Sequence, residues 1–345
     1  MPDFQSERMY RRARAIVIAV VLVAAVLVAW LAPRFGWFQR PKPPRVVVLY
    51  CFSTLDDVMQ NRLLPAFREQ WLRDQGEAVE FVATFAGSGG ITDRILDKYP
   101  AEIAIVSSEL DAYRLPVAWR SWRELPHNGI LARTPLVIVV RRGNPKNIRG
   151  FEDLGREGID LLHGDPATSG AAELAILAEY GSALRRHGDS ERASQQLLGI
   201  WRNVTTQLPT AREARSRFET GEGDALVTYE EDAIGSPSRA RIEGDVVYPV
   251  STIVAEPVVV KIEKNIDDRQ RRLFDAFVEF LWTREAQQIL VDYGFHSVYE
   301  ELNASRGDLA TIEDPFTLSG VGGASARRDV LERVWRDRVV PQLRR

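Results

Sequence analysis

The chain has 345 residues, enough for two compact lobes. Its formal net charge of −3 excludes the strongly basic surface of a nucleic-acid-binding domain, although backbone dipoles could still hold a small anion. The single cysteine, Cys51, excludes an internal disulfide, and the four scattered histidines form no HExxH-type pair. We therefore expect no metal site, no cofactor and no nucleic-acid partner.

Residues 15–32 form an unbroken apolar run, AIVIAVVLVAAVLVAWLA, long enough to cross a hydrocarbon core of about 30 Å. Four arginines precede it: Arg8, Arg11, Arg12 and Arg14. By the positive-inside rule, residues 1–14 stay in the cytoplasm and the rest of the chain lies outside it. A cleaved signal peptide is the alternative, but the run is long for one and ends in a poor cleavage sequence, WLAP. We expect an uncleaved transmembrane anchor, followed by a stiff proline-rich spacer over residues 33–45.

The soluble body begins with alternating strand and helix patterns. Apolar runs predict strands over residues 45–52, 79–85 and 103–106, and the spacing of apolar residues predicts helices over 56–73 and 91–98. This βαβαβ order predicts an α/β fold with an open sheet covered by helices. Cys51 would lie within the first strand as a buried, inert thiol.

The second half continues the same alternation. We predict strands over residues 136–140, 160–163, 225–228 and 253–260, a helix over 171–184, and one long amphipathic helix over 269–290. Six apolar residues of that last helix would face the core: Leu273, Phe274, Phe277, Phe280, Leu281 and Ile289.

Two small-residue turns, FAGSGGI at 85–91 and DPATSGA at 165–171, each place a serine between a predicted strand and a helix. Serine is a favoured N-cap, and small neighbours let an external group approach the free N–H groups of the helix start. The helix start also carries about half a positive charge. Most such turns are only capping structures, but two facing each other would form a site for a tetrahedral anion.

Longer motifs surround these turns. TPLVIVVRRGNPKNIRGFEDL begins at Thr134, HGDPATSGAAELAILAEYGSAL begins at His163, and IVAEP begins at Ile253. Together with the GSG of residues 87–89, they make the chain resemble the sulfate-binding proteins of sulfate/thiosulfate ABC transporters, which are type II periplasmic binding proteins. The resemblance runs in order from about residue 46 to 330.

The resemblance implies a two-lobe fold with a ligand cleft between the lobes. Lobe 1 would comprise residues 46–133 and return over 253–345 with the C-terminal helices, and lobe 2 would comprise residues 134–252. Hinge strands near Thr134 and Ile253 would let the lobes close on the ligand and exclude water.

The resemblance also implies the ligand-binding residues, which in that family are mainly helix-start N–H groups. In chain order they are Ser53 or Thr54, Ser88, Gly89, Ser169, Gly170, Ala171, Ala211 and Tyr229. Three of these positions depart from the family pattern: Thr54 (or Ser53) replaces an Asp, Ala171 replaces a Gly, and Tyr229 replaces a Trp. Gly90 also replaces the usual Lys. If every polar group in the site is a donor, a protonated oxyanion finds no acceptor there.

The resemblance implies an extracytoplasmic receptor for a tetrahedral oxyanion, tethered to the periplasmic face of the inner membrane. Sulfate is the expected ligand, with thiosulfate, molybdate and tungstate as alternatives, and the expected partners are ABC permease subunits. A membrane-tethered sensor or scaffold that uses the same clamp is the alternative function. We expect that the chain is not an enzyme. Ser88 or Ser169 could serve as a nucleophile, but no segment that contains a histidine obviously lies near either serine to act as its base.

Overall fold

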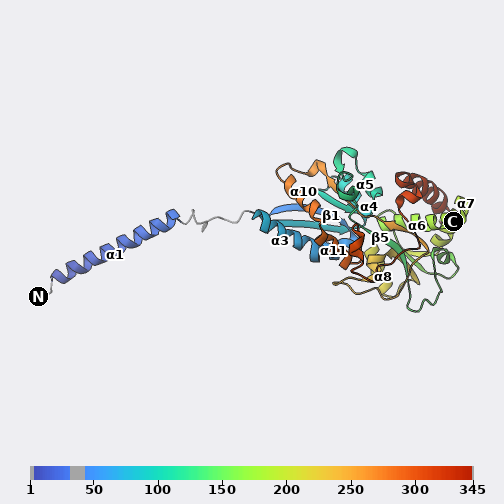
Figure 1. Ribbon diagram of the computed structural model, residues 1–345, viewed down its shortest axis with the longest axis horizontal. Helices are drawn as coiled ribbons and strands as arrows, with labels where there is room; N and C mark the ends of the chain where they lie inside the picture. The colour runs from blue at the N-terminus through green and yellow to red at the C-terminus, as the bar shows by residue number, and fades with distance from the viewer. Residues whose placement is uncertain (1–3, 32–42, 344–345) are drawn as a thin grey trace. The chain divides into compact units, whose positions relative to one another are not determined.

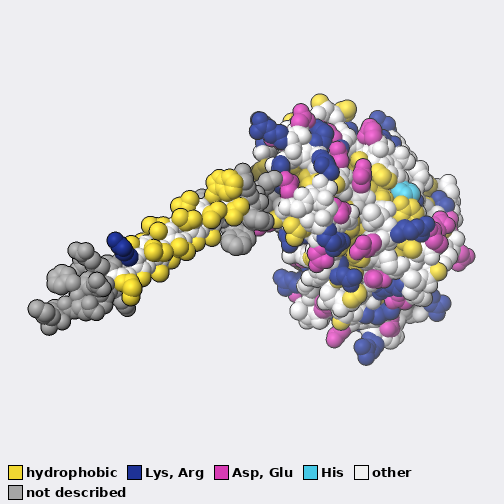
Figure 2. Space-filling view, turned by 60° about the vertical axis from the view of Figure 1, so that its left-hand side comes forward, with side chains coloured by type: hydrophobic (Ala, Val, Ile, Leu, Met, Phe, Trp, Pro, Cys, Tyr) yellow, Lys and Arg dark blue, Asp and Glu magenta, His cyan; other side chains and the backbone are white. Residues whose placement is uncertain are grey.

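The computed structural model describes residues 4–31 and 43–343, and the chain divides into two units, Met1–Pro44 and Arg45–Arg345. In the first unit, α1 (Phe4–Leu31) contains residues 15–31 of the predicted apolar run, and Ala32 lies outside the described residues. Its stretch Arg12–Leu31 has a mean hydropathy of 2.7 and is long enough to cross a membrane, which fits an anchor and a signal sequence equally. Figure 2 shows hydrophobic side chains along the visible face of this helix. Most of the predicted spacer, residues 33–42, lies outside the described residues.

The compact unit is built on two sheets. The first has five strands in the order β2-β1-β3-β11-β4, namely Val79–Ala86, Arg45–Phe52, Ile103–Val106, Val258–Ile262 and Arg120–Ser121. β1 pairs in parallel with β2 and β3, whereas β11 runs antiparallel to β3 and β4. The carboxyl ends of β1, β2 and β3 therefore meet at one edge, where ligands bind in open α/β sheets.

Helices cover this sheet, and Figure 1 shows α3, α4, α5 and α10 around β1. Their bounds are α2 (Asp56–Val58), η2 (Met59–Leu63), α3 (Leu64–Gln75), α4 (Ser88–Leu96), α5 (Glu109–Arg114) and α10 (Arg271–Phe280). Aromatic rings join the layers: Phe277 of α10 lies 5.1 Å from Phe67 of α3 and 4.8 Å from Phe81 of β2, between ring centroids. Cys51 of β1 is a free, buried thiol, as predicted, and burial raises its pKa well above the usual range.

The second sheet has eight strands. Its main path is β13-β10-β5-β8-β6-β7, with β9 and β12 pairing with β5. In that order the bounds are Asp314–Phe316, Ser251–Ala255, Ala132–Val140, Ala225–Tyr229, Leu161–Gly164 and Val204–Leu208, followed by Asp245–Val247 and His296–Ser297.

The helices beside the second sheet are α6 (Gly170–His187), α7 (Ser190–Arg202), α8 (Ala211–Glu219), α9 (Glu230–Ile234), α11 (Arg284–Asp292), α12 (Glu300–Asn303), η9 (Arg327–Val339) and α13 (Val340–Leu343). Short 3₁₀ helices complete the described chain: η1 (Ser53–Leu55), η3 (Val117–Trp119), η4 (Pro126–Gly129), η5 (Phe151–Gly155), η6 (Glu263–Asn265), η7 (Leu318–Val321) and η8 (Gly323–Ser325). η9 is wound as a π-helix and packs on α6 and α7, where its Trp335 lies 4.2 Å from Trp201 between ring centroids.

The chain crosses between the sheets three times: before β5, between β10 and β11, and between β11 and β12, and the first two crossings run side by side. One enters β5 at Ala132, and the other joins β10 to β11 through Glu256 and Pro257. They pair through Ala255 with Thr134 and through Ile130 with Val258. Two paired segments form the short connection that a hinge requires. The lobe boundaries themselves stay a prediction, and β13 and η9 lie with the second sheet.

Two predictions were wrong because each joined two separate elements into one. The strand predicted over residues 253–260 is two strands in different sheets, since Pro257 has no N–H for a ladder. The helix predicted over 269–290 breaks after Phe280, and the Thr283 side chain caps the new helix by accepting from Ala286 N at 3.2 Å. The six apolar residues predicted for the buried side are all buried.

Candidate anion-binding site

The two predicted serine–glycine turns lie where the two sheets meet, and they contact each other. The backbone N–H of Gly90 donates to the carbonyl oxygen of Thr168 at 3.3 Å. A Cβ at Gly87 would lie 2.2 Å from that same oxygen and 2.8 Å from the carbonyl oxygen of Pro209. Gly87 has an ordinary φ of −59°, so its backbone conformation does not require glycine. The requirement is steric, because a side chain at this position would clash with the neighbouring turns.

A third helix start joins them. Thr210 caps α8 by accepting from Glu213 N at 3.1 Å, and Ala211 is the first residue of that helix. The Thr168 hydroxyl donates to the Pro209 carbonyl at 3.0 Å and so ties the starts of α6 and α8 together. We call the meeting point of residues 87–90, 167–170 and 209–211 the three-helix junction.

The starts of three helices give this junction a positive potential. The first N–H groups of a helix have no acceptor within the helix, and the aligned peptide dipoles add about half a positive charge. α6 has 18 residues, and α4 and α8 have 9 each, so each is long enough to carry this dipole. The arrangement favours an anion without a neutralising cation.

The two serines differ from the expected capping. Ser88 is the first residue of α4 rather than its N-cap; its hydroxyl accepts from Ser107 N at 2.9 Å and donates to Asp111 Oδ2 at 2.6 Å. Ser169 is the N-cap of α6, but its side chain caps no N–H group. A Cβ at Gly164 would lie 2.7 Å from Ser169 Oγ, so this hydroxyl faces β6. The N–H groups of Gly170 and Ala171 at the α6 start can still meet a ligand at the junction.

Gly170, the first residue of α6, closely approaches residues beside the first sheet. A Cβ there would lie 2.1 Å from Ser107 Oγ, 2.8 Å from Ser88 Cβ and 3.1 Å from Asp111 Oδ2. The junction therefore brings together Gly170 and Ser88, which are far apart in the sequence.

Three buried polar atoms beside the junction have no hydrogen-bond partner within the described part of the chain. They are Ser107 Oγ, Asp111 Oδ1 and the hydroxyl of Tyr229. Buried hydroxyl groups are normally hydrogen-bonded, because leaving one unpaired costs about 1–3 kcal/mol. Unpaired groups next to three helix starts are what a small polar ligand would satisfy.

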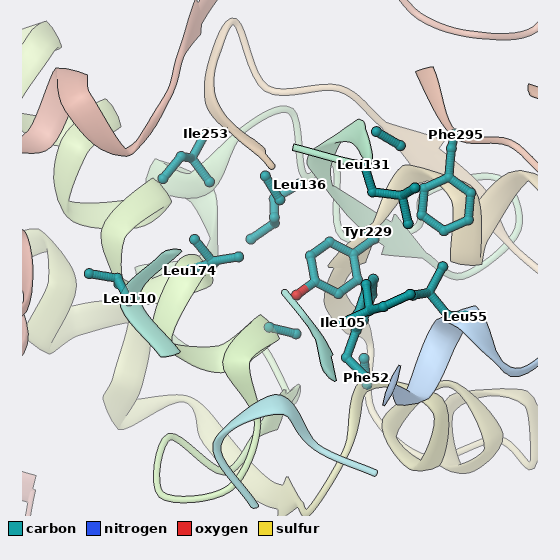
Figure 3. Close-up of a cluster of buried hydrophobic side chains, with 14 of the residues drawn as sticks. Phe52, Leu55, Ile105, Leu110, Leu131, Leu136, Leu174, Tyr229, Ile253 and Phe295 are labelled. Atoms are coloured by element: carbon teal, nitrogen blue, oxygen red, sulfur yellow. The ribbon is translucent and has the colours of Figure 1, made fainter. Parts of the chain in front are cut away.

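Tyr229 ends β8, and its ring packs edge-on against Phe52 with centroids 6.0 Å apart. Figure 3 shows its hydroxyl pointing away from Phe295 within the apolar cluster. Burial raises the pKa of Tyr229 well above its usual range, and Glu231, Asp111 and Asp232 act in the same direction. The neighbouring Ser107 side chain lowers the pKa of Tyr229, although the hydroxyls of Ser107 and Tyr229 form no hydrogen bond of ordinary geometry with each other. Tyr229 is thus a neutral phenol that can donate to an anion.

Thr54 and Ser53 lie in η1, near the start of α8, and both are buried. The Thr54 hydroxyl donates to Glu231 Oε1 at 2.8 Å, and Thr134 donates to Glu231 Oε2 at 2.6 Å. The Thr54 side chain is therefore committed to this carboxylate. Burial raises the pKa of Glu231 to about 7, against the lowering effect of these hydrogen bonds.

Ion pairs cross the junction next to Thr54. Arg212 of α8 pairs with Asp56 and with Asp57, at 3.2 Å to Asp57 Oδ2, and Arg239 lies 3.5 Å from Asp57 Oδ2. They join α2, beside the first sheet, to the α8 side of the second sheet. These pairs would have to separate if the two sheets moved apart.

Sequence reasoning missed Ser107 and Asp111. A signal was present, because Ser107 and Ser108 follow the apolar run of β3, at the edge where β1 and β2 also end. Of the predicted residues, the junction brings together Ser88, Gly89, Ser169, Gly170 and Ala211, with Tyr229 beside them. Ala171 follows Gly170 in the first turn of α6. No cluster of three or more His, Cys, Asp or Glu side chains in the described residues could hold a metal ion.

A groove of about 660 Å³ borders the junction. The turn before α6 contributes Asp165, Pro166 and Ala167 to its wall, and three arginines also line it: Arg114, Arg327 and Arg336. Arg327 lies 3.2 Å from Glu173 Oε1, Arg336 lies 3.3 Å from Glu332 Oε1, and Arg114 pairs with Asp93, so all three cations are paired.

Comparisons of the sequence and of the structure with known proteins point to the same class of protein. The family model of bacterial extracellular solute-binding proteins matches residues 47–296. The chain is 29% identical to a sulfate-binding protein of Synechococcus elongatus, over 76% of this chain and 77% of that protein. It is 28% identical to a thiosulfate-binding protein of Pseudomonas aeruginosa, over 87% of this chain and 91% of that protein. The solved structure of the sulfate-binding protein SubI of Mycobacterium tuberculosis superposes with a TM-score of 0.73 at 25% identity, covering 82% of this chain and 98% of that one.

Proposed function

Because the chain belongs to the family of bacterial extracellular solute-binding proteins, we propose that it is a receptor that binds a tetrahedral oxyanion at the three-helix junction. Sulfate is the ligand we propose, as in its named relatives, and an ABC permease is the partner that receives it. The observation that carries the proposal is a pair of buried hydroxyls beside three helix starts, those of Ser107 and Tyr229, which have no hydrogen-bond partner among the described residues.

The proposed contacts are hydrogen bonds from neutral donors. Backbone N–H groups of Ser88, Gly89, Gly170 and Ala211 would donate to the anion, together with the hydroxyls of Ser107 and Tyr229. Hydrogen bonds to a charged group contribute about 1.5–3 kcal/mol each, more than those between neutral groups. Burial strengthens them further by removing competing water. Binding of this kind requires no covalent step.

Closure would complete the site. The paired crossings at Thr134 and Ala255 form the proposed hinge, and Arg212 with Asp56 and Asp57 would latch the closed form. A ligand that contacts both sheets favours the closed form by the difference in its affinity for the two forms. The closed receptor would then dock on the permease.

We further propose that α1 stays uncleaved and tethers the receptor to the periplasmic face of the inner membrane. A tether would raise the local concentration of the receptor beside its permease. The intact mass of the protein recovered from membranes tests this point. We expect a chain that retains residues 1–32, and a mature N-terminus after residue 32 would contradict the anchor.

Isothermal titration calorimetry of the full-length chain in detergent tests ligand binding. Sulfate, thiosulfate, molybdate and phosphate are titrated separately at constant ionic strength. We expect sulfate to bind with one anion per chain. The absence of heat from all four anions at every pH tested would contradict the proposal.

A further inference from the structure

Asp111 places a carboxylate inside the site proposed above. It lies in α5 with its side chain fully buried, and its Oδ2 accepts from the Ser88 hydroxyl at 2.6 Å. The same oxygen is 3.1 Å from the Cβ position of Gly170. The carboxylate thus lies between the starts of α4 and α6, where donor groups of both helices converge.

The charge of Asp111 is only partly compensated. Arg114 Nη1 lies 3.5 Å from Asp111 Oδ1 without making a hydrogen bond, and Arg114 also pairs with Asp93 of α4. The other charged groups near Asp111 are Glu173 of α6 and Arg327 of η9, which pair with each other at 3.2 Å. The hydroxyl of Tyr229, on β8, is neutral and faces Asp111 and Ser107.

Sulfate is a dianion throughout the neutral pH range and offers no proton. Beside a buried carboxylate it would suffer a like-charge repulsion that low dielectric makes strong. The other proposed contacts are donors, so Asp111 is the group at the junction that can change from acceptor to donor. A proton on this carboxyl group would turn the repulsion into a hydrogen bond.

We propose that Asp111 is a specificity-determining residue and that the bound oxyanion and Asp111 share one proton, taken from solvent when sulfate binds. This inference rests on the proposed oxyanion function. It replaces the expectation of a site made only of donors, since Asp111 supplies an acceptor that a protonated ligand could also use.

A definite pH dependence follows. Sulfate raises the pKa of Asp111, because the proton is held more tightly in the complex than in the free receptor. Affinity is therefore full below the pKa of Asp111 in the free receptor. Above it, affinity falls by up to about tenfold per pH unit until the pKa of the complex is reached. Burial already raises the pKa of Asp111 in the free receptor, while Ser88, Arg114 and Arg327 lower it.

Glu173 needs a matched control, because burial raises its pKa to about 7 and it titrates in the same range. Its hydrogen-bond partner is Arg327 rather than a group of the three-helix junction. Asp111→Asn removes the titrating group at the junction, whereas Glu173→Gln removes the neighbouring one. Asn keeps the size of Asp111 and an oxygen that can accept from Ser88.

The test is calorimetric titration of the full-length chain with sulfate between about pH 5.5 and 8.5, in two buffers of different ionisation enthalpy. Wild-type protein and Glu173→Gln should take up a proton with sulfate and lose affinity as pH rises. Asp111→Asn should take up none and bind sulfate at the alkaline end at least about tenfold more tightly than wild-type protein.

Three results would overturn the inference. They are sulfate binding by wild-type protein without proton uptake across the range, an unchanged pH slope in Asp111→Asn, and loss of the slope in Glu173→Gln alone. If Asp111→Asn does not fold, the proton uptake of wild-type protein decides. The absence of sulfate binding at any pH would instead refute the proposed function itself.

Discussion

Replacing Gly170 by Ala adds one methyl group at the narrowest point of the three-helix junction. The new Cβ would lie 2.1 Å from Ser107 Oγ and 2.8 Å from Ser88 Cβ. Gly170 is not among the glycines with positive φ, and it begins a helix, where alanine is favourable. The substitution therefore acts on the contact between the two sheets, and the fold of each should remain intact.

The size of the effect follows from these distances. Carbon and oxygen atoms pack at about 3.5 Å, so the start of α6 must move by about 1 Å relative to Ser88 and Ser107. A shift of that size breaks hydrogen bonds from one side of the junction to a bound anion. Losing two charge-assisted bonds of about 1.5–3 kcal/mol each lowers the affinity by about 10²- to 10⁴-fold.

Calorimetric titration with sulfate measures this loss, and thermal unfolding followed by circular dichroism checks the fold. Gly90→Ala is the matched control: this glycine also lies in the first turn of α4, but a Cβ there would meet no atom within 4 Å. We expect Gly90→Ala to bind as wild-type protein does. A folded Gly170→Ala protein with wild-type affinity would refute the location of the site.

Three further predictions concern the surroundings of the junction. Tyr229→Phe should weaken sulfate binding by about tenfold or more. It should leave the melting temperature of the free protein unchanged or raise it, since the lost hydroxyl is buried and has no partner among the described residues. Calorimetry measures the affinity and thermal melts measure the stability; an unchanged affinity would contradict a role for Tyr229 in binding. Arg212→Ala should release sulfate faster in stopped-flow measurements without unfolding the chain, because its pairs with Asp56 and Asp57 join the two sides; an unchanged dissociation rate would exclude the latch. Burial raises the folded-state pKa of Glu231 to about 7, so its contribution to stability is full below the unfolded-state pKa of about 4.5 and is lost as pH rises toward 7. Urea titrations should show Glu231→Gln losing less stability than wild-type protein over that interval, and parallel curves would contradict this.

The local elements were predictable wherever one pattern governed them. The apolar run of β1 was predicted as Arg45–Phe52 and observed with the same bounds. The small-residue turn before α4 predicted a helix start that external groups can approach. Short-range chemistry decides both features, namely burial of an apolar strand and backbone access at small residues.

Other features depended on tertiary context that spacing does not reveal. The helix predicted over residues 269–290 breaks at the Thr283 cap, which a continuous apolar face conceals. Asp111 looked like an ordinary polar residue of a short helix, and only the fold brings its carboxylate to Ser88 and Gly170. The meeting of three helix starts is likewise a long-range property, since Gly87, Thr168 and Pro209 are far apart in the sequence.

A crystal structure of the full-length chain with selenate, an isostere of sulfate, tests the central claim most directly. Anomalous scattering from selenium locates the anion independently of the protein density. The predicted position is the three-helix junction, with the anion oxygens within hydrogen-bonding reach of the Gly170 N–H and the Tyr229 hydroxyl. Selenium in the groove beside Arg327 instead, with the junction still closed on itself, would contradict the account.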